Sequence, residues 1–179
     1  MHAEFMRDKS KLMPKIESPV LINSMRIWHC NYSSLEQLNA CSNLDSLVIA
    51  SLPEENFNFI SQCKNLRYLS VCHLPKMHDL SSLANLRQLE VLSLETLPSW
   101  DGSGKVQLVD SLRPIALLPK LKYVELFGVR TDSKSPSELI ESNSIISVRF
   151  SKYLKKEVTK FYKESGCNDD FAPEVEFEN

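Results

Sequence analysis

The sequence predicts an α/β solenoid of about six stacked repeats, and three observations support this fold class. An apolar triplet, whose second and third members lie three and five positions after the first, recurs at intervals of 22, 22, 23, 32 and 24 residues. Further apolar residues precede most triplets at steps of three, and a Leu-Pro pair follows three consecutive triplets. A period of this size is typical of repeat proteins, in which no unit buries its apolar side without a neighbour. The triplets begin at Ile22, Leu44, Leu66, Leu89, Leu121 and Ile145.

Each triplet predicts a short strand, and the residues before it predict a helical or 3-10 segment. In the third unit, Leu69 and Val71 are two positions apart, the spacing at which side chains of a strand share one side. Phe57, Ile60 and Cys63 precede this triplet at steps of three, which suits a helical segment with one side inward. The proline of each Leu-Pro pair lacks an N–H group and therefore ends the strand.

Both ends of the ladder depart from the repeat, as expected where the core of a solenoid would otherwise be exposed. We expect residues 1–19 to form an N-terminal cap, so that the solenoid covers residues 1–152. We expect residues 153–179 to form a C-terminal capping helix and an acidic tail. The helix is predicted from apolar side chains that share one helical face, followed by a glycine stop: Leu154, Val158, Phe161, Tyr162 and Gly166.

The last stretch, residues 169–179, contains five acidic side chains and no basic one. This composition is typical of a solvated tail. The stretch also contains three apolar side chains that could hold it against the solenoid: Phe171, Val175 and Phe177. The sequence leaves both alternatives open.

These residues resemble the leucine-rich repeat family, in particular its short class with internalin-like and phosphatase-regulator-like repeats. The family pattern L-x-x-L-x-L-x-x-[N/C] is met in full at residues 22–30, and the resemblance covers roughly residues 12–154. The other five units lack the Asn or Cys and hold Leu52, Leu74, Leu97, Val129 and Tyr153 there. The resemblance implies a horseshoe with a concave parallel sheet and a helical or 3-10 convex side. It also implies binding of macromolecules rather than catalysis.

Residues between the ladder positions are expected on the concave side, where they form a candidate partner-binding surface. Six parallel strands about 4.8 Å apart span roughly 25–30 Å, enough for an interface of about 800 Å² per partner. The aromatic and arginine side chains expected there are types enriched at binding hot spots. Alternatively, these side chains only cover the sheet, or a terminal cap lies over them. The candidates are Arg26, Trp28, Tyr68, Glu95, Tyr123, Glu125, Phe127 and Arg149.

The 32-residue interval contains an insertion around residues 99–106, with the sequence SWDGSGKV. Two of the chain's four glycines lie here, so we expect an exposed, mobile loop of the kind that is often functional. Trp100 either packs back on the solenoid or contacts the partner, and we include it among the candidate partner-binding residues. The segment is not a phosphate-binding loop, because Ser99 and Val106 stand where that motif requires Gly and Ser or Thr.

Composition and charge argue against several other classes. The net charge of −2 predicts no strong attraction to nucleic acid or to a membrane surface. No apolar run is long enough to span a membrane, and the N-terminal segment has no apolar signal core, so we expect a cytoplasmic protein. The five cysteines are expected to be free thiols. Neither they nor the four histidines show metal-ligand or nucleophile spacing, so we expect no cofactor, no metal and no catalysis.

The sequence therefore predicts a non-enzymatic module that captures another protein on its concave side. It would act as a small intracellular regulator or inhibitor, of the kind that confers immunity to a toxin. The alternative is an adaptor or regulatory subunit of a larger complex, such as a phosphatase or a ubiquitin ligase. An adaptor needs a second docking motif, for which the C-terminal helix and its acidic tail are the candidate. An enzyme is the third class, and it would need a pocket that the repeat pattern does not predict.

Overall fold

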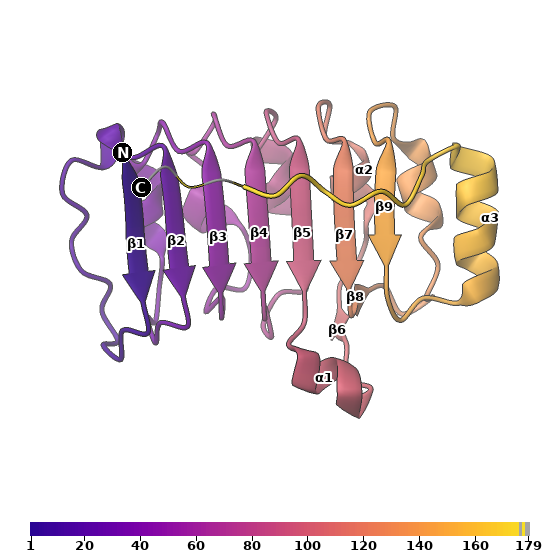
Figure 1. The fold of residues 1–179 in the computed structure, drawn as a ribbon, viewed down its shortest axis with the longest axis horizontal. Coiled ribbons are helices and arrows are strands. Elements are labelled where there is room, and N and C mark those ends of the chain that lie inside the picture. Colours follow the sequence, from indigo (N-terminus) through magenta and orange to yellow (C-terminus); the bar gives the residue numbers. More distant parts are fainter. Residues whose placement is uncertain (176, 178–179) are drawn as a thin grey trace.

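The computed structural model describes residues 1–175 and 177, apart from the side chain of residue 101. Across these residues, seven parallel strands form one sheet in the order β1-β2-β3-β4-β5-β7-β9 (Figure 1). The strands are β1 (His2–Met6), β2 (Ser24–Trp28), β3 (Ser46–Ala50), β4 (Tyr68–Cys72), β5 (Val91–Glu95), β7 (Tyr123–Phe127) and β9 (Ser147–Phe150). The predicted α/β class with a parallel sheet is confirmed.

The register of the sheet follows the apolar triplets. Leu69 of β4 lies between Leu47 of β3 and Leu92 of β5, and all three side chains are fully buried. A register slip of one residue would turn every one of these side chains to the opposite side of the sheet. The strong burial preference of leucine, about 1.5–3 kcal/mol for each side chain, therefore specifies the pairing.

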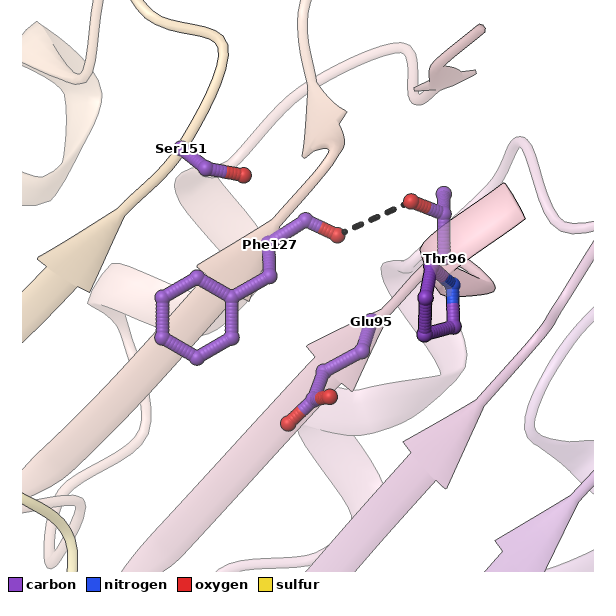
Figure 2. Close-up of a pocket in the computed structure, with 5 residues that line it drawn as sticks. Glu95, Thr96, Phe127 and Ser151 are labelled. Atoms are coloured by element: carbon purple, nitrogen blue, oxygen red, sulfur yellow. Dashed lines mark hydrogen bonds between the residues drawn. The ribbon is translucent and has the colours of Figure 1, made fainter. Parts of the chain in front are cut away.

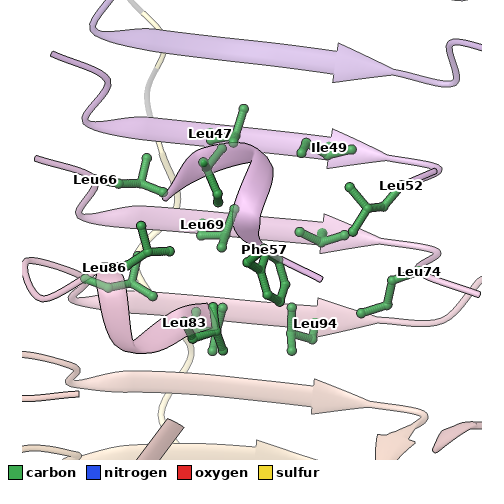
Figure 3. Packing of buried hydrophobic residues seen from close by; sticks show 14 of the residues in the cluster. Leu47, Ile49, Leu52, Phe57, Leu66, Leu69, Leu74, Leu83, Leu86 and Leu94 are labelled. Carbon is green, nitrogen blue, oxygen red and sulfur yellow. The ribbon is translucent and has the colours of Figure 1, made fainter. Parts of the chain in front are cut away.

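Short helical segments lie behind the sheet in Figure 1 and cover its apolar side. Leu83 and Leu86 reach the core from one such segment, and Phe57 reaches it from another (Figure 3). They face the inward side chains of the strands, such as Leu69 and Leu94. A 3-10 helix has three residues per turn, which explains the predicted steps of three. These segments are η2 (Glu36–Ala40), η3 (Asn58–Ile60), η4 (Ser81–Asn85), α2 (Arg113–Ala116) and η5 (Ser137–Glu141), while η1 (Pro19–Leu21) precedes β2.

The N-terminal residues add a strand that the sequence analysis did not predict. β1 pairs in parallel with β2, from His2 opposite Ser24 to Met6 opposite Trp28. The strand contains no leucine triplet, and only Ala3 and Phe5 turn toward the core, where they are partly buried. Ala3 is small and Phe5 is an isolated large apolar residue, so the sequence pattern is too weak to identify a strand here. The pairing of this segment with β2 makes it a strand.

The C-terminal capping helix is present as α3 (Lys155–Ser165). Phe161 is 1% exposed and packs edge-on against Phe150 of β9, with ring centroids 5.4 Å apart. Gly166 ends the helix with φ of 69°, in the left-handed region that favours glycine. Leu154 is not part of the buried side, because it precedes the first turn and is 40% exposed.

The insertion contains more regular secondary structure than the loop that the sequence predicted, and residues 102–105 are exposed as expected. It begins with the short helix α1 (Pro98–Ser103), which starts at a proline, a residue favoured in the first turn. It continues as β6 (Gln107–Leu108), which pairs in parallel with β8 (Val129–Arg130) in a separate two-stranded sheet. The glycines therefore lie at and beyond the end of a helix rather than in an open loop.

The residue after most strands has a positive φ, which is an additional repeated feature. At Gly128 the position also leaves no room for a side chain, since a Cβ added there would lie 2.2 Å from the hydroxyl oxygen of Thr96. Other units place larger residues in this left-handed conformation, at a conformational cost. Because their side chains share no type, the pattern could not be read from the sequence. The residues are Arg7, His29, Ser51, His73 and Gly128, and Lys152 takes the same conformation two residues after β9, with φ between 52° and 73° in all six.

The chain's C-terminal segment returns across the front of the sheet, from the β9 end toward β1 (Figure 1). We call residues 169–175 and 177 the strap. The hydroxyl of Ser147 donates a hydrogen bond of 2.8 Å to the carbonyl oxygen of Asp170. At the far end, the Phe177 ring centroid lies 4.6 Å from that of His2. Of the two alternatives for the tail, the structure therefore favours a segment held against the sheet.

Candidate functional site

The side of the sheet opposite the helical segments carries the candidate site, and we call it the open face. Alternate residues of each strand point to it, and the parallel register aligns them in three columns. The first column contains His2, Ser24, Ser46, Tyr68, Val91, Tyr123 and Ser147. The second contains Glu4, Arg26, Val48, Ser70, Ser93, Glu125 and Arg149. The third contains Met6, Trp28, Ala50, Cys72, Glu95 and Phe127.

The structure brings eight of the nine predicted partner-binding residues to this open face. They are Arg26, Trp28, Tyr68, Glu95, Tyr123, Glu125, Phe127 and Arg149, and all are half-buried. The ninth, Trp100, lies in α1 beyond the carboxyl end of β5. Its ring packs edge-on against His73, with centroids 5.3 Å apart. Of the two alternatives for Trp100, packing back on the molecule is the one observed.

The strap crosses the open face at the first column, over the amino-terminal half of the strands (Figure 1). Ser147, beneath it, is only 1% exposed. Burial raises the pKa of Tyr68 in this column, and three nearby carboxylates raise it further: Glu125, Glu95 and Glu174. The alternative that a terminal segment covers the candidate surface therefore holds for the first column and for Glu125 and Arg149 of the second, since the N–H of Ala172 donates to Glu125 Oε1 at 3.4 Å and Phe171 packs on Arg149. Figure 1 shows the carboxyl-terminal half of the strands outside the path of the strap, and the register places the third column in that half.

Two arginines of the second column are held in place by their neighbours. Arg149 forms an ion pair with Glu125, with 3.0 Å between Nη1 and Oε1. Its guanidinium carbon lies 3.8 Å from the ring centroid of Phe171 in the strap and 5.2 Å from that of Phe127. Cation–π contacts of this kind contribute roughly 0.5–1 kcal/mol at exposed sites. Phe171 itself remains 76% exposed, so the strap is attached through one side of this ring.

At the other end of the face, Arg26 makes a similar arrangement. Its guanidinium carbon lies 4.6 Å above the ring of Trp28, and its Nη1 is 3.5 Å from the carboxylate of Glu4. The ion pair is exposed and contributes little to stability. The ion pair holds the guanidinium of Arg26 over the indole of Trp28, and both groups are accessible to a partner. Glu4 was absent from the sequence-based set because the strand that carries it was not recognised.

Glu95 differs from the other charged residues of the open face. Glu95 and Glu125 lie on the adjacent strands β5 and β7, where two carboxylates close together repel one another. In the structure Arg149 pairs with Glu125, and the hydroxyl of Ser93 lies 2.9 Å from Glu95 and 3.4 Å from Glu125. In the part of the chain that the structure describes, Glu95 forms no ion pair. Its carboxylate is therefore an available acceptor for a cation.

A hollow of about 290 Å³ lies beside Glu95, at the carboxyl ends of β5 and β7 (Figure 2). Phe127 and Pro98 supply apolar walls, and Thr96 and Ser151 complete the lining. Thr96 and Pro98 were not among the sequence-based candidates. Both follow the ladder residues of β5, and only the path of the insertion brings Pro98 to the face.

No group of three or more His, Cys, Asp or Glu side chains among the described residues could hold a metal ion. Burial raises the pKa of the Cys63 thiol to about 12, which suppresses the nucleophilic thiolate. None of the helices within the described part is long and apolar enough to cross a membrane.

Comparison of the chain with protein-family models and with curated proteins finds no match.

Proposed function

We propose that this protein is a non-enzymatic, leucine-rich repeat module that captures another protein on its open face. The observation that carries the proposal is the alignment of aromatic and arginine side chains on one side of a parallel sheet, at Trp28, Phe127, Arg26 and Arg149. Seven strands about 4.8 Å apart span roughly 29 Å, the width of a standard protein interface. Residues of these types dominate binding energy where they are fully covered by a partner.

The repeated geometry supports the solenoid interpretation behind this proposal. Strands pair at register steps of 22, 22, 22, 23, 32 and 24 residues, with a helical connection behind nearly every strand. A stacked sheet of this kind is a rigid support for side chains on its outer side. In a horseshoe of such repeats the open face would be the concave one.

The partner would contact the half of the open face that the strap leaves uncovered. Trp28 and Phe127 stand near opposite ends of the third column, separated by the small side chains of Ala50 and Cys72 and by Glu95, which lies next to Phe127. A convex ridge on the partner would fit between the large side chains of Trp28 and Phe127. A module that occludes a partner's surface in this way acts as a cytoplasmic regulator or inhibitor without chemistry of its own.

The test is affinity capture from cells followed by mass spectrometry, with matched variants. A partner retained by the wild type and by Leu117→Ala, an exposed leucine on the helical side, should be lost from Trp28→Ala and Phe127→Ala. Truncating an aromatic anchor at an interface typically weakens binding by about 2 kcal/mol or more. Circular dichroism confirms that each variant is folded. Full retention by both aromatic variants would contradict the proposal.

The adaptor alternative predicts a second docking site outside the open face. The candidate docking motif is the C-terminal helix with its acidic tail. The tail, which forms the strap, packs on the same open face through Phe171 and Asp170, which supports the single-face module. Deleting residues 169–179 separates the two functions and preserves Asn168, whose backbone hydrogen-bonds with the β9 edge. Retention of every partner fits the single-face module, whereas loss of one of two partners fits the adaptor.

A further inference from the structure

The hollow beside Glu95 has a combination of groups that suits one class of ligand. Its walls are the ring of Phe127 and the ring of Pro98, which are apolar. Both hydroxyls of its lining are already engaged with the backbone. Thr96 Oγ1 donates to the carbonyl oxygen of Phe127 at 3.4 Å, and Ser151 Oγ accepts from the N–H of Gly128 at 2.8 Å. These hydroxyls are neutral, so the carboxylate of Glu95 is the charged acceptor among the residues that line the hollow.

We propose that this hollow binds the cationic side chain of a lysine or arginine that a protein partner presents. The inference rests on the proposed function and names the chemistry that the partner must carry. Lysine and arginine combine an apolar stem with a charged end, which matches apolar walls beside one carboxylate. A neutral aliphatic side chain would leave the carboxylate without a partner, and an acidic one would be repelled by it.

The charges around the hollow favour a cation over other ligands. Arg149, a cation close to the ring of Phe127, is held by the carboxylate of Glu125 at 3.0 Å. Burial raises the pKa of the Cys72 thiol on β4, and the negative charge of Glu95 raises it further. The same negative potential that disfavours a thiolate attracts an ammonium or guanidinium group. Charge-assisted hydrogen bonds to a carboxylate are about twice as strong as neutral ones.

The direct test uses small probes and does not require the partner. We would titrate the full-length, ¹⁵N-labelled protein with N-acetyl-lysine amide, N-acetyl-arginine amide and, as the neutral control, N-acetyl-norleucine amide. The two cationic probes should shift the backbone amide signals of Thr96, Gly128 and Ser151, and the neutral probe should not. Raising the salt concentration should weaken the shifts, because salt screens exposed charges.

Glu95→Gln removes the charge and keeps the shape of the side chain. This variant should bind the cationic probes about tenfold more weakly, the effect expected when a charged hydrogen-bond partner is lost. Glu55→Gln is the matched control, because it makes the same charge change at an exposed position on a connecting loop, and it should bind as the wild type does. Equal shifts from the norleucine probe, or unchanged binding by Glu95→Gln, would overturn the inference.

The captured partner separates the two proposals. Loss of the partner from Trp28→Ala together with full retention by Glu95→Gln would leave the binding module standing and reject the cation site. Specific cationic shifts at the hollow, with every partner retained by Trp28→Ala and Phe127→Ala, would support the cation site and reject capture through the aromatic ends of the open face.

Discussion

Replacing Leu69 by alanine tests the alternation on which the open face depends. Leu69 lies in the central strand β4, is fully buried, and pairs with Leu47 and Leu92 on either side. Truncation loses the transfer free energy of the removed carbons and leaves a cavity that neighbouring strands cannot fill without breaking their register. Such substitutions cost about 2–5 kcal/mol, and this site, packed on both sides, should fall in the upper half of that range.

Ser70→Ala is the matched control, one residue further along the same strand. Its side chain points to the open face and is half-buried, so the free energy of unfolding should change by no more than about 0.5 kcal/mol. Urea unfolding followed by circular dichroism measures both changes through the midpoint and the slope. For a chain of this size, each 1 kcal/mol lowers the melting temperature by about 2–4 °C.

A result with equal midpoints for the two variants would refute the assigned alternation. It would mean that Leu69 is not the inward residue and that the three columns do not share one face. Because solenoids can unfold in parts, the midpoint should also be measured by tryptophan fluorescence. Coincident transitions from both probes would justify reading the shift as a free energy.

Three further predictions concern the turns and the strap. Gly128→Ala should destabilise the protein by about 1–3 kcal/mol, because residue 128 has a φ of 71° and the added Cβ would clash with the side chain of Thr96. A urea midpoint equal to that of the wild type would contradict this prediction. Burial and then the charge of His29 lower the pKa of His73 below 6.5, so the unfolded chain binds this proton more tightly. The contribution of His73 to the free energy of unfolding should be fully present above about pH 6.5 and fall as the pH decreases below it. Asparagine tolerates the left-handed backbone, so His73→Asn should show a smaller fall in urea midpoint between pH 7 and pH 5. Deleting residues 169–179 should lower the melting temperature by only about 2–4 °C, and a decrease as large as that of Leu69→Ala would show that the strap belongs to the core.

The parts of the fold that could be predicted from sequence are those that bury many similar side chains. The triplet at Leu66, Leu69 and Val71 identifies its strand and register because misplacing it would expose three apolar side chains. The C-terminal helix was predictable for the same reason, since Phe161 and its neighbours form one apolar side. The eight candidate residues on the strands could be predicted from this register. Side chains alternate along a strand, so the residues between buried positions face the opposite side of the sheet.

The parts that could not be predicted depend on contacts between distant segments. β1 contains only Ala3 and Phe5 as inward residues, and its pairing with β2 makes it a strand. The insertion gained β6 through hydrogen bonds with β8, which lies more than twenty residues later. The left-handed turns recur at residues as different as His73 and Gly128, so no residue type signals them.

For the six repeats, the sequence by itself determined which strand residues are buried, which alternate outward, and in what order those strands stack, because the hydrophobic effect acts on every repeat in the same way. Only the tertiary structure decided which outward residues are accessible. The strap covers the first column through contacts such as Asp170 with Ser147 and reaches the second through Phe171 on Arg149, and the path of α1 sets Pro98 beside Glu95 and Phe127. These are single contacts between remote parts of the chain, and each contributes too little and recurs too rarely to leave a pattern in the sequence.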